Sequence, residues 1–220
     1  MLYVAVALGV FAVAFLLGSI PWGVIISKTV YHTDIREHGS GNIGTTNAMR
    51  TMGKAGGAAV FLLDFGKGLA SGALAMVAAN LLLPDAGLAA DALASRDLLL
   101  AISAMGCTWG HIFSPWLGFH GGKGIAVAIG ALCFTFGPAG AIVEVFVIFA
   151  PLVLITRYVS VGSIAAALAC PFFAFYLYWP NLPAACAISI AALLVVFAHR
   201  ENIKRLINHN ENRIGSKKKA

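Results

Sequence analysis

The sequence predicts an all-α integral membrane protein: a bundle of seven transmembrane helices with its N-terminus outside and its C-terminus in the cytoplasm. Hydrophobic residues make up 60% of the chain and charged residues only 11%, which is far from the composition of a soluble globular domain. Residues 1–27 and 158–199 contain no Asp, Glu, Lys or Arg. The basic residues also lie almost entirely on one side of the predicted spans.

The number of spans follows from the lengths of the apolar runs. The run 158–199 has roughly 40 residues and would be about 60 Å long as one helix, twice the ~30 Å of the hydrocarbon core. Trp179-Pro180-Asn181-Leu182-Pro183 supplies a break, and Gly137-Pro138 divides the run 124–156 in the same way. The predicted spans are therefore 2–24, 55–83, 98–117, 123–136, 138–156, 160–179 and 182–199.

The charges support an odd number of spans. This arrangement puts 13 of the 15 Lys and Arg residues on one side, with Arg96 opposite and Lys67 within a span. The positive-inside rule makes that side cytoplasmic, so we expect 29–53, 118–123 and 200–220 to face the cytoplasm. We expect a single domain, 1–220, whose basic tail (about 200–220) contacts anionic lipid headgroups and not nucleic acid. Oligomeric state cannot be predicted from these features.

The segment from Gly39 to Arg50 is the most informative stretch of the chain. It is polar and glycine-rich, and it lies between two apolar runs. Glycines such as Gly41 adopt positive φ angles that let backbone amides point at an anion. Ser40 and Asn42 add neutral donors, and the Arg50 guanidinium suits phosphate. These features predict a loop that captures a phosphorylated substrate at the membrane surface.

Asp64 and Lys67 are charged residues within a predicted span, where each costs roughly 2.5–3.5 kcal/mol on insertion scales. Their i, i+3 spacing places them on one helix face, and Gly66 and Gly68 allow a backbone or a ligand to approach closely. Two interpretations remain open. The pair is either a structural ion pair facing the bundle interior, or a site in which Lys67 binds phosphate and Asp64 orients it.

Two further polar clusters fall on the predicted cytoplasmic side. His111 precedes Gly121-Gly122-Lys123-Gly124, which offers amides and an ammonium where the next helix begins. His199 and Asn202 share a helix face at the end of the last span. The alternatives are a packing role for His111 and a basic interfacial helix for the tail. Neither a metal site nor a cofactor is predicted, and Glu144 is assigned no role.

These clusters resemble, almost end to end, the bacterial membrane-embedded glycerol-3-phosphate acyltransferases that use acyl phosphate. The resemblance rests on Gly18-Ser19-Ile20-Pro21, Gly39 to Arg50, Asp64-Phe65-Gly66-Lys67-Gly68, Gly110-His111-Ile112-Phe113, Gly118 to Gly124, and the tail residues His199, Asn202-Ile203, Arg205-Leu206 and Glu211. It implies transfer of a fatty acyl group from acyl phosphate to the 1-hydroxyl of sn-glycerol 3-phosphate, giving lysophosphatidic acid for phospholipid synthesis. It also implies a bacterial inner-membrane enzyme whose site faces the cytoplasm.

The chemistry of acyl phosphate fits direct transfer, since this mixed anhydride is already activated and the sequence offers no convincing covalent nucleophile. The expected catalytic residues are His111, Asn42, His199 and Asn202. Substrate binding is expected from Ser40, Gly41, Arg50, Lys67, Gly68, Gly121, Gly122, Lys123 and Gly124. The base is either a histidine or the leaving phosphate.

The runner-up interpretation is a membrane transporter of a phosphorylated metabolite, because anion cradles between helices fit that function too. However, the sequence contains no evident internal repeat, and apart from Arg96 the predicted outside loops lack basic residues.

Overall fold

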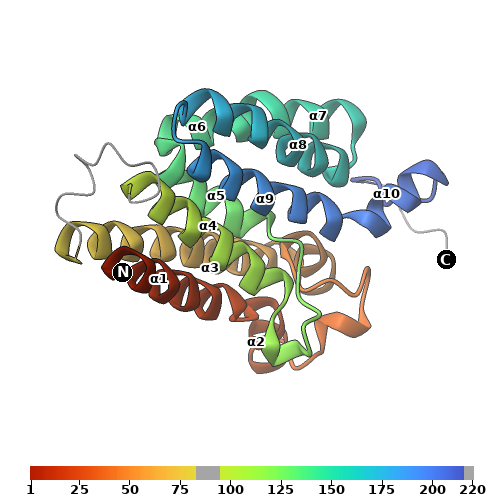
Figure 1. The fold of residues 1–220 in the computed structure, drawn as a ribbon. Helices are drawn as coiled ribbons and strands as arrows, with labels where there is room; N and C mark the ends of the chain where they lie inside the picture. Colours follow the sequence, from red (N-terminus) through yellow and green to blue (C-terminus); the bar gives the residue numbers. More distant parts are fainter. Residues whose placement is uncertain (83–94, 216–220) are drawn as a thin grey trace.

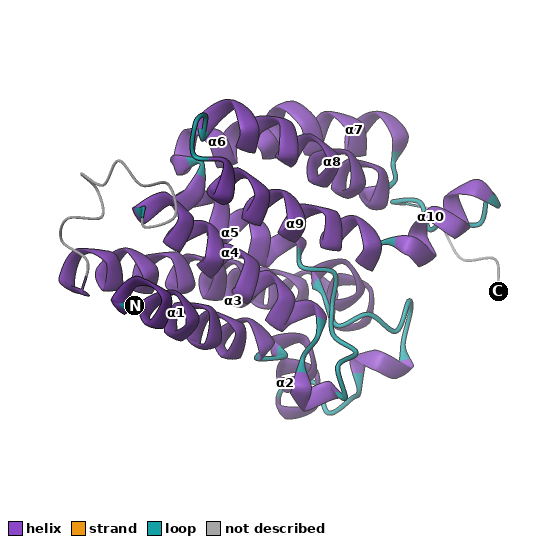
Figure 2. Cartoon of the chain, in the orientation of Figure 1, coloured by secondary structure: helices purple, strands orange, loops and turns teal. Residues whose placement is uncertain are grey.

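The described residues, 1–82 and 95–215 of a computed structural model, form helices joined by loops and contain no strand (Figure 2). The α-helices are α1 (Leu2–Ser19), α2 (Trp22–Thr29), α3 (Thr45–Leu82), α4 (Arg96–Ile112), α5 (Ile125–Thr135), α6 (Gly137–Val143), α7 (Ala150–Thr156), α8 (Val159–Leu177), α9 (Leu182–Ala198) and α10 (Arg200–Ile207). Short 3₁₀ turns lie at Ile35–Glu37 and Pro115–Leu117, and a π-helical segment, Glu144–Phe149, joins α6 to α7.

The helical segments largely match the predicted spans. Within the described residues, five are long and apolar enough to cross a membrane, or six if α9 and α10, which meet at 50°, are taken as one. The predicted span 123–136 is the shorter helix α5. The count of seven therefore stays a prediction. Lys217, Lys218 and Lys219 of the tail, and Asp85 and Asp91 of the predicted outside loop, lie outside the described residues.

The first predicted span, 2–24, is broken. Helix α1 ends at Ser19 and α2 begins at Trp22, because Pro21 has no N–H to continue the hydrogen-bond ladder and restrains the residue before it. Ile20 is accordingly extended, with φ −60° and ψ 117°. The break leaves the Ile20 carbonyl available to a side chain from another helix, and α3 supplies one.

Helix α3 begins ten residues before the predicted span 55–83. It starts at Thr45 and bends at Gly53, whose φ of 74° favours glycine. The prediction that 39–50 is one loop is therefore wrong for its second half. Only 39–44 is loop, and Arg50 lies on the first turns of a helix.

Small residues bring the helices into close contact. A Cβ at Gly18 of α1 would lie 2.0 Å from the carbonyl oxygen of Cys107 in α4. A Cβ at Gly110 of α4 would lie 2.0 Å from the carbonyl oxygen of Phe15 in α1. Contacts of this kind are the usual way for helices to approach closely in a membrane. They fix α4, and with it His111, against α1.

The polar segments gather at one end of the bundle. The loops 30–44 and 113–124 and helix α10 all lie at the end away from the N-terminus (Figure 1). Segments far apart in the sequence are thereby brought together, as a shared site requires.

Candidate active site

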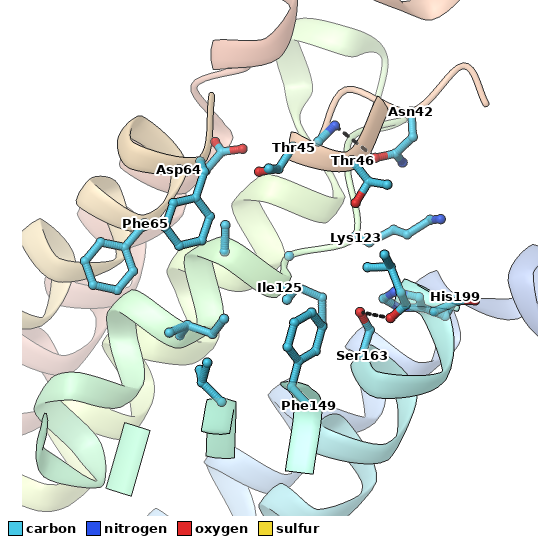
Figure 3. A pocket seen from close by; sticks show the side chains of 18 of the residues that line it. Asn42, Thr45, Thr46, Asp64, Phe65, Lys123, Ile125, Phe149, Ser163 and His199 are labelled. Carbon is cyan, nitrogen blue, oxygen red and sulfur yellow. Dashed lines mark hydrogen bonds between the residues drawn. The ribbon is translucent and has the colours of Figure 1, made fainter. Parts of the chain in front are cut away.

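A cavity of about 630 Å³ opens where these segments meet. Its polar end is lined by Ser40, Asn42, Thr45, Thr46, Arg50, His111, Lys123, His199 and Asn202. Its apolar wall is lined by Phe61, Phe65, Ile125, Ile129, Ile142, Val145, Phe146 and Phe149. Figure 3 shows Asn42 and Thr46 across from Lys123 and His199, with Ile125 and Phe149 below them in that view. The cavity can thus hold an anionic group and an aliphatic chain together.

Asn47 organises the loop 39–44. Its side-chain oxygen accepts a hydrogen bond from the Ser40 amide at 2.9 Å, and its Nδ2 lies 3.1, 3.0 and 2.8 Å from the carbonyl oxygens of Ile35, His38 and Asn42. The side chain is buried. The sequence alone did not reveal this structural role.

The glycines of the loop do not form the expected amide cradle. The Gly41 amide donates to the His38 carbonyl at 3.0 Å, and the Gly44 amide donates to Asn42 Oδ1 at 3.0 Å. Gly41, at φ +70°, shapes the turn and does not line the cavity. Its predicted role in binding substrate through its amide is not supported by this geometry.

The N-terminus of α3 offers the anion site instead. Thr45 and Thr46 begin this helix and line the cavity, and their amides form no hydrogen bond with any described residue. The Thr45 hydroxyl is also buried without a partner in the described part of the chain. Free amides at a helix N-terminus, reinforced by the helix dipole, are a natural binding place for phosphate.

Cationic side chains face this helix end. The Arg50 guanidinium forms no hydrogen bond or ion pair with any described residue, and it lines the cavity. The Lys123 ammonium donates to Asn202 Oδ1. Burial, together with the neighbouring Arg205 and Arg50 and against the opposing effect of Glu211, lowers the pKa of Lys123 to about 8. Excess positive charge is what a phosphate would neutralise.

Glu211 holds the tail against the cavity, a role that the sequence did not reveal. Its carboxylate accepts from Asn202 Nδ2 at 2.8 Å, from Arg205 Nε at 2.7 Å and from Ser160 Oγ at 3.2 Å. Both polar atoms of the Asn202 side chain are therefore engaged. Asn202 lines the cavity as predicted, and its contacts indicate that it anchors Lys123.

Gly121 and Gly122 lie beside His111 and are not free donors. Their amides donate to the carbonyls of Ile112 (2.9 Å) and His111 (3.0 Å). A Cβ at Gly122 would lie 2.1 Å from His111 Nε2. The two amides that were expected to bind an anion are therefore already bonded to carbonyl groups of α4. These glycines allow the loop to pass close to the histidine. Gly124, at φ +84°, starts α5 and does line the cavity.

Asp64 and Lys67 form the structural ion pair. The Lys67 ammonium lies 2.8 Å from Asp64 Oδ1, 2.9 Å from the Ile20 carbonyl oxygen and 2.8 Å from His111 Nδ1. An ammonium has three protons, and these contacts use all of them. Lys67 is buried and does not line the cavity. The interpretation of Lys67 as a phosphate ligand is not supported.

Gly68 serves helix packing and not substrate binding. A Cβ at Gly68 would lie 2.2 Å from the carbonyl oxygen of Val127 in α5. A Cβ at Gly130 of α5 would lie 2.1 Å from the carbonyl oxygen of Phe65 in α3. These reciprocal contacts hold α3 and α5 together along one side of the cavity. Gly68, like Lys67, Gly121 and Gly122, does not line it.

Comparisons with known proteins decide the family. Residues 8–209 match the family described as glycerol-3-phosphate acyltransferase. The chain belongs to that family. Glycerol-3-phosphate acyltransferases of Thermosynechococcus vestitus and Rhodopseudomonas palustris (strain BisB5) are each 37% identical to it, over 96% and 98% of this chain and 97% and 100% of theirs.

Solved structures agree with this family membership. The chain is similar to the crystal structure of PlsY, an integral membrane glycerol 3-phosphate acyltransferase, in its glycerol 3-phosphate form (TM-score 0.80, 34% identity, 95% of this chain and 96% of that chain). Its lysophosphatidic acid form gives a TM-score of 0.77 at 33% identity, over 95% of each chain. The protein is a multi-pass membrane acyltransferase.

Proposed function

We propose that the protein transfers a fatty acyl group from acyl phosphate directly to the 1-hydroxyl of sn-glycerol 3-phosphate, releasing lysophosphatidic acid and phosphate. The observation that carries this proposal is a cavity that joins a cationic, donor-rich end to an apolar wall. An acyl phosphate has these two parts in one molecule. The relatives' names and the two ligand forms of PlsY support glycerol 3-phosphate as the acceptor.

The residues divide between the two substrates. Ser40, Arg50 and Lys123 bind the phosphate of glycerol 3-phosphate together with the first amides of α3. The acyl chain lies along the apolar wall, and the donor's phosphate lies at the polar end beside His111. Holding both reactants in line can contribute roughly 7–11 kcal/mol without a covalent intermediate. Asn42 supplies its Nδ2 to the developing oxyanion, since its Oδ1 already accepts from Gly44.

A product assay tests this function against transport. Purified protein in detergent, given acyl phosphate and radiolabelled glycerol 3-phosphate, should form labelled lysophosphatidic acid in proportion to enzyme. Proteoliposomes should accumulate no soluble labelled glycerol 3-phosphate in the absence of donor. Uptake without product formation would establish the transporter interpretation and remove the acyltransferase one.

We also propose that the cavity faces the cytoplasm, because the basic loops lie at its end of the bundle. In a cysteine-free background, single cysteines at the half-buried Thr33 and the exposed Asn208 should escape membrane-impermeant thiol reagents added to intact cells. Both should react after permeabilisation, which controls for their accessibility. Labelling of either in intact cells would reverse the orientation.

The lowered pKa of Lys123 predicts a pH dependence. In the free enzyme, Lys123 loses its proton as the pH rises through about 8, so kcat/KM for glycerol 3-phosphate should fall above that pH. Initial rates between pH 6.5 and 10 measure this limb. In Lys123→Arg the limb should be absent from that range, because arginine stays protonated. An identical limb in both proteins would assign it to another group.

A further inference from the structure

A second, smaller cavity of about 60 Å³ lies beside the main one, bounded by α4, α5, α8, α9 and the π-helical segment Glu144–Phe149. We call it the side cavity. Four side chains line both cavities and form a shared wall: Ile125, Ile129, Val145 and Phe149 (Ile125 and Phe149 are labelled in Figure 3). Much of the remaining lining is alanine: Ala104, Ala128, Ala131, Ala166, Ala167, Ala191 and Ala192.

The carboxyl group of Glu144 lines the side cavity without a partner. Only 4% of this residue is exposed, and its Oε1 is fully buried with no hydrogen bond to a described residue. No described residue forms an ion pair with it either. An unpaired carboxylate inside a membrane bundle is costly, so the carboxyl keeps its proton and offers an O–H donor.

The π-helical segment places this carboxyl against the acyl-binding wall. Glu144 begins the segment, and at its end the Ala150 amide bonds to the Val145 carbonyl, five residues back. Segments of this kind are rare and frequently mark functional sites. Here the same wide turns supply the buried carboxyl and, through Val145 and Phe149, part of the wall that the side cavity shares with the main cavity.

The size and lining of the side cavity limit what it can hold. A water molecule or a hydroxyl group needs at least roughly 10–15 Å³ of such volume. About 60 Å³ therefore admits a small polar group with little carbon attached, and is far too small for the acyl chain that fits the 630 Å³ cavity. The alanines favour carbon, whereas Glu144 requires a hydrogen-bonding atom. An oxygen-bearing branch on an alkyl chain meets both requirements.

We propose that the side cavity is a specificity site for the acyl donor, in which Glu144 hydrogen-bonds a hydroxyl or similar oxygen substituent borne near the middle of the acyl chain. The chain lies along the apolar wall of the main cavity, and its substituent reaches across the shared wall. This assignment rests on the proposed function, because that function places the acyl chain there. It makes hydroxylated acyl phosphates a substrate class of the enzyme beside unsubstituted ones.

Matched donors test the assignment. Three acyl phosphates of one chain length are compared: unsubstituted, hydroxylated at mid-chain, and hydroxylated next to the carbonyl. The kcat/KM of each hydroxylated donor is divided by that of the unsubstituted donor on the same preparation. In Glu144→Leu the mid-chain ratio should fall about tenfold from its wild-type value, because a hydroxyl buried against leucine lacks a partner. Glu144→Gln, whose amide donates and accepts, should keep the wild-type ratio.

Two controls locate the effect. The ratio for the donor hydroxylated next to the carbonyl should be equal in all three proteins, since that hydroxyl lies at the polar end of the main cavity. Ala166 of α8 lines the side cavity and not the main one. Ala166→Leu fills the side cavity and should lower the mid-chain ratio as Glu144→Leu does.

The outcomes separate the possibilities. An unchanged mid-chain ratio in folded Glu144→Leu or Ala166→Leu would overturn the assignment and leave Glu144 paired with an internal water only. A change confined to the other hydroxylated donor would overturn it as well. Wild-type protein that acylated glycerol 3-phosphate from none of the three donors would instead contradict the proposed function.

Infrared difference spectroscopy gives a readout without turnover. Non-reactive acyl phosphonates, with and without the mid-chain hydroxyl, are added to the protein in nanodiscs. The C=O stretch of a neutral carboxyl should shift with the hydroxylated phosphonate only, and this signal should be absent in Glu144→Gln. No shift, an equal shift with both phosphonates, or a shift that persists in Glu144→Gln would each refute the contact.

Discussion

Replacing either Arg50 or Lys123 by alanine should lower kcat/KM by at least about 100-fold. Each change removes a charge-assisted contact to phosphate worth roughly 1.5–3 kcal/mol and also misplaces the reacting groups. The Arg50 guanidinium has no partner among the described residues to lose, so its removal should cost activity and not stability. Initial rates at varied glycerol 3-phosphate, with yield and thermal unfolding of each purified variant, measure both.

Two further variants sharpen this test. Arg50→Lys should be nearly as damaging as Arg50→Ala, because lysine cannot reproduce the bidentate fork. Lys28→Ala is the control: Lys28 lies in α2, pairs with Asp34 at 3.1 Å and is half exposed. It should stay near wild type. Folded Arg50→Ala and Lys123→Ala proteins with normal turnover would place the phosphate site elsewhere.

Gly122→Ala should be comparably severe although it adds only one methyl group. The new Cβ would lie 2.1 Å from His111 Nε2, so either the ring or the loop 118–124 must move. A displacement of about 1 Å in a reacting or orienting group can cost about 100-fold in rate. We therefore expect kcat to fall by about that factor in a protein that still inserts and purifies.

Gly66→Ala provides the matched control for this substitution. It lies in the interior of α3 beside Lys67, and an added Cβ there has nothing within 4 Å. Alanine is favoured over glycine in a helix by about 1 kcal/mol, so stability should hold or rise. If Gly122→Ala and Gly66→Ala were equally active, the close approach to His111 would have no part in catalysis.

The sequence predicted which segments meet but not how their atoms are used. Span positions followed from apolar length and from breaks at Gly137-Pro138 and Trp179-Pro180-Asn181-Leu182-Pro183, which are local properties of the chain. The clustering of Arg50, Lys123 and His199 followed from the placement of charges on one side. Eight of the thirteen predicted site residues line the cavity: Ser40, Asn42, Arg50, His111, Lys123, Gly124, His199 and Asn202.

The remaining five do not line the cavity, because their contacts depend on partners distant in sequence. Lys67 is saturated by a carbonyl of the broken first helix and by His111, and Gly68 packs against α5. Gly121 and Gly122 bond to carbonyls of α4. In the same way Asn47 and Glu211 proved structural only through contacts with other segments. Glycine content alone does not say whether an amide is free.

The identity of the acyl donor tests the account most directly. One preparation of purified enzyme should be assayed with acyl phosphate and with acyl-CoA of the same chain length, at saturating glycerol 3-phosphate. A compact phosphate fits the small polar end of the cavity, so turnover with acyl phosphate and little or none with acyl-CoA is predicted. Comparable kcat/KM for the two donors would contradict the proposed site and mechanism.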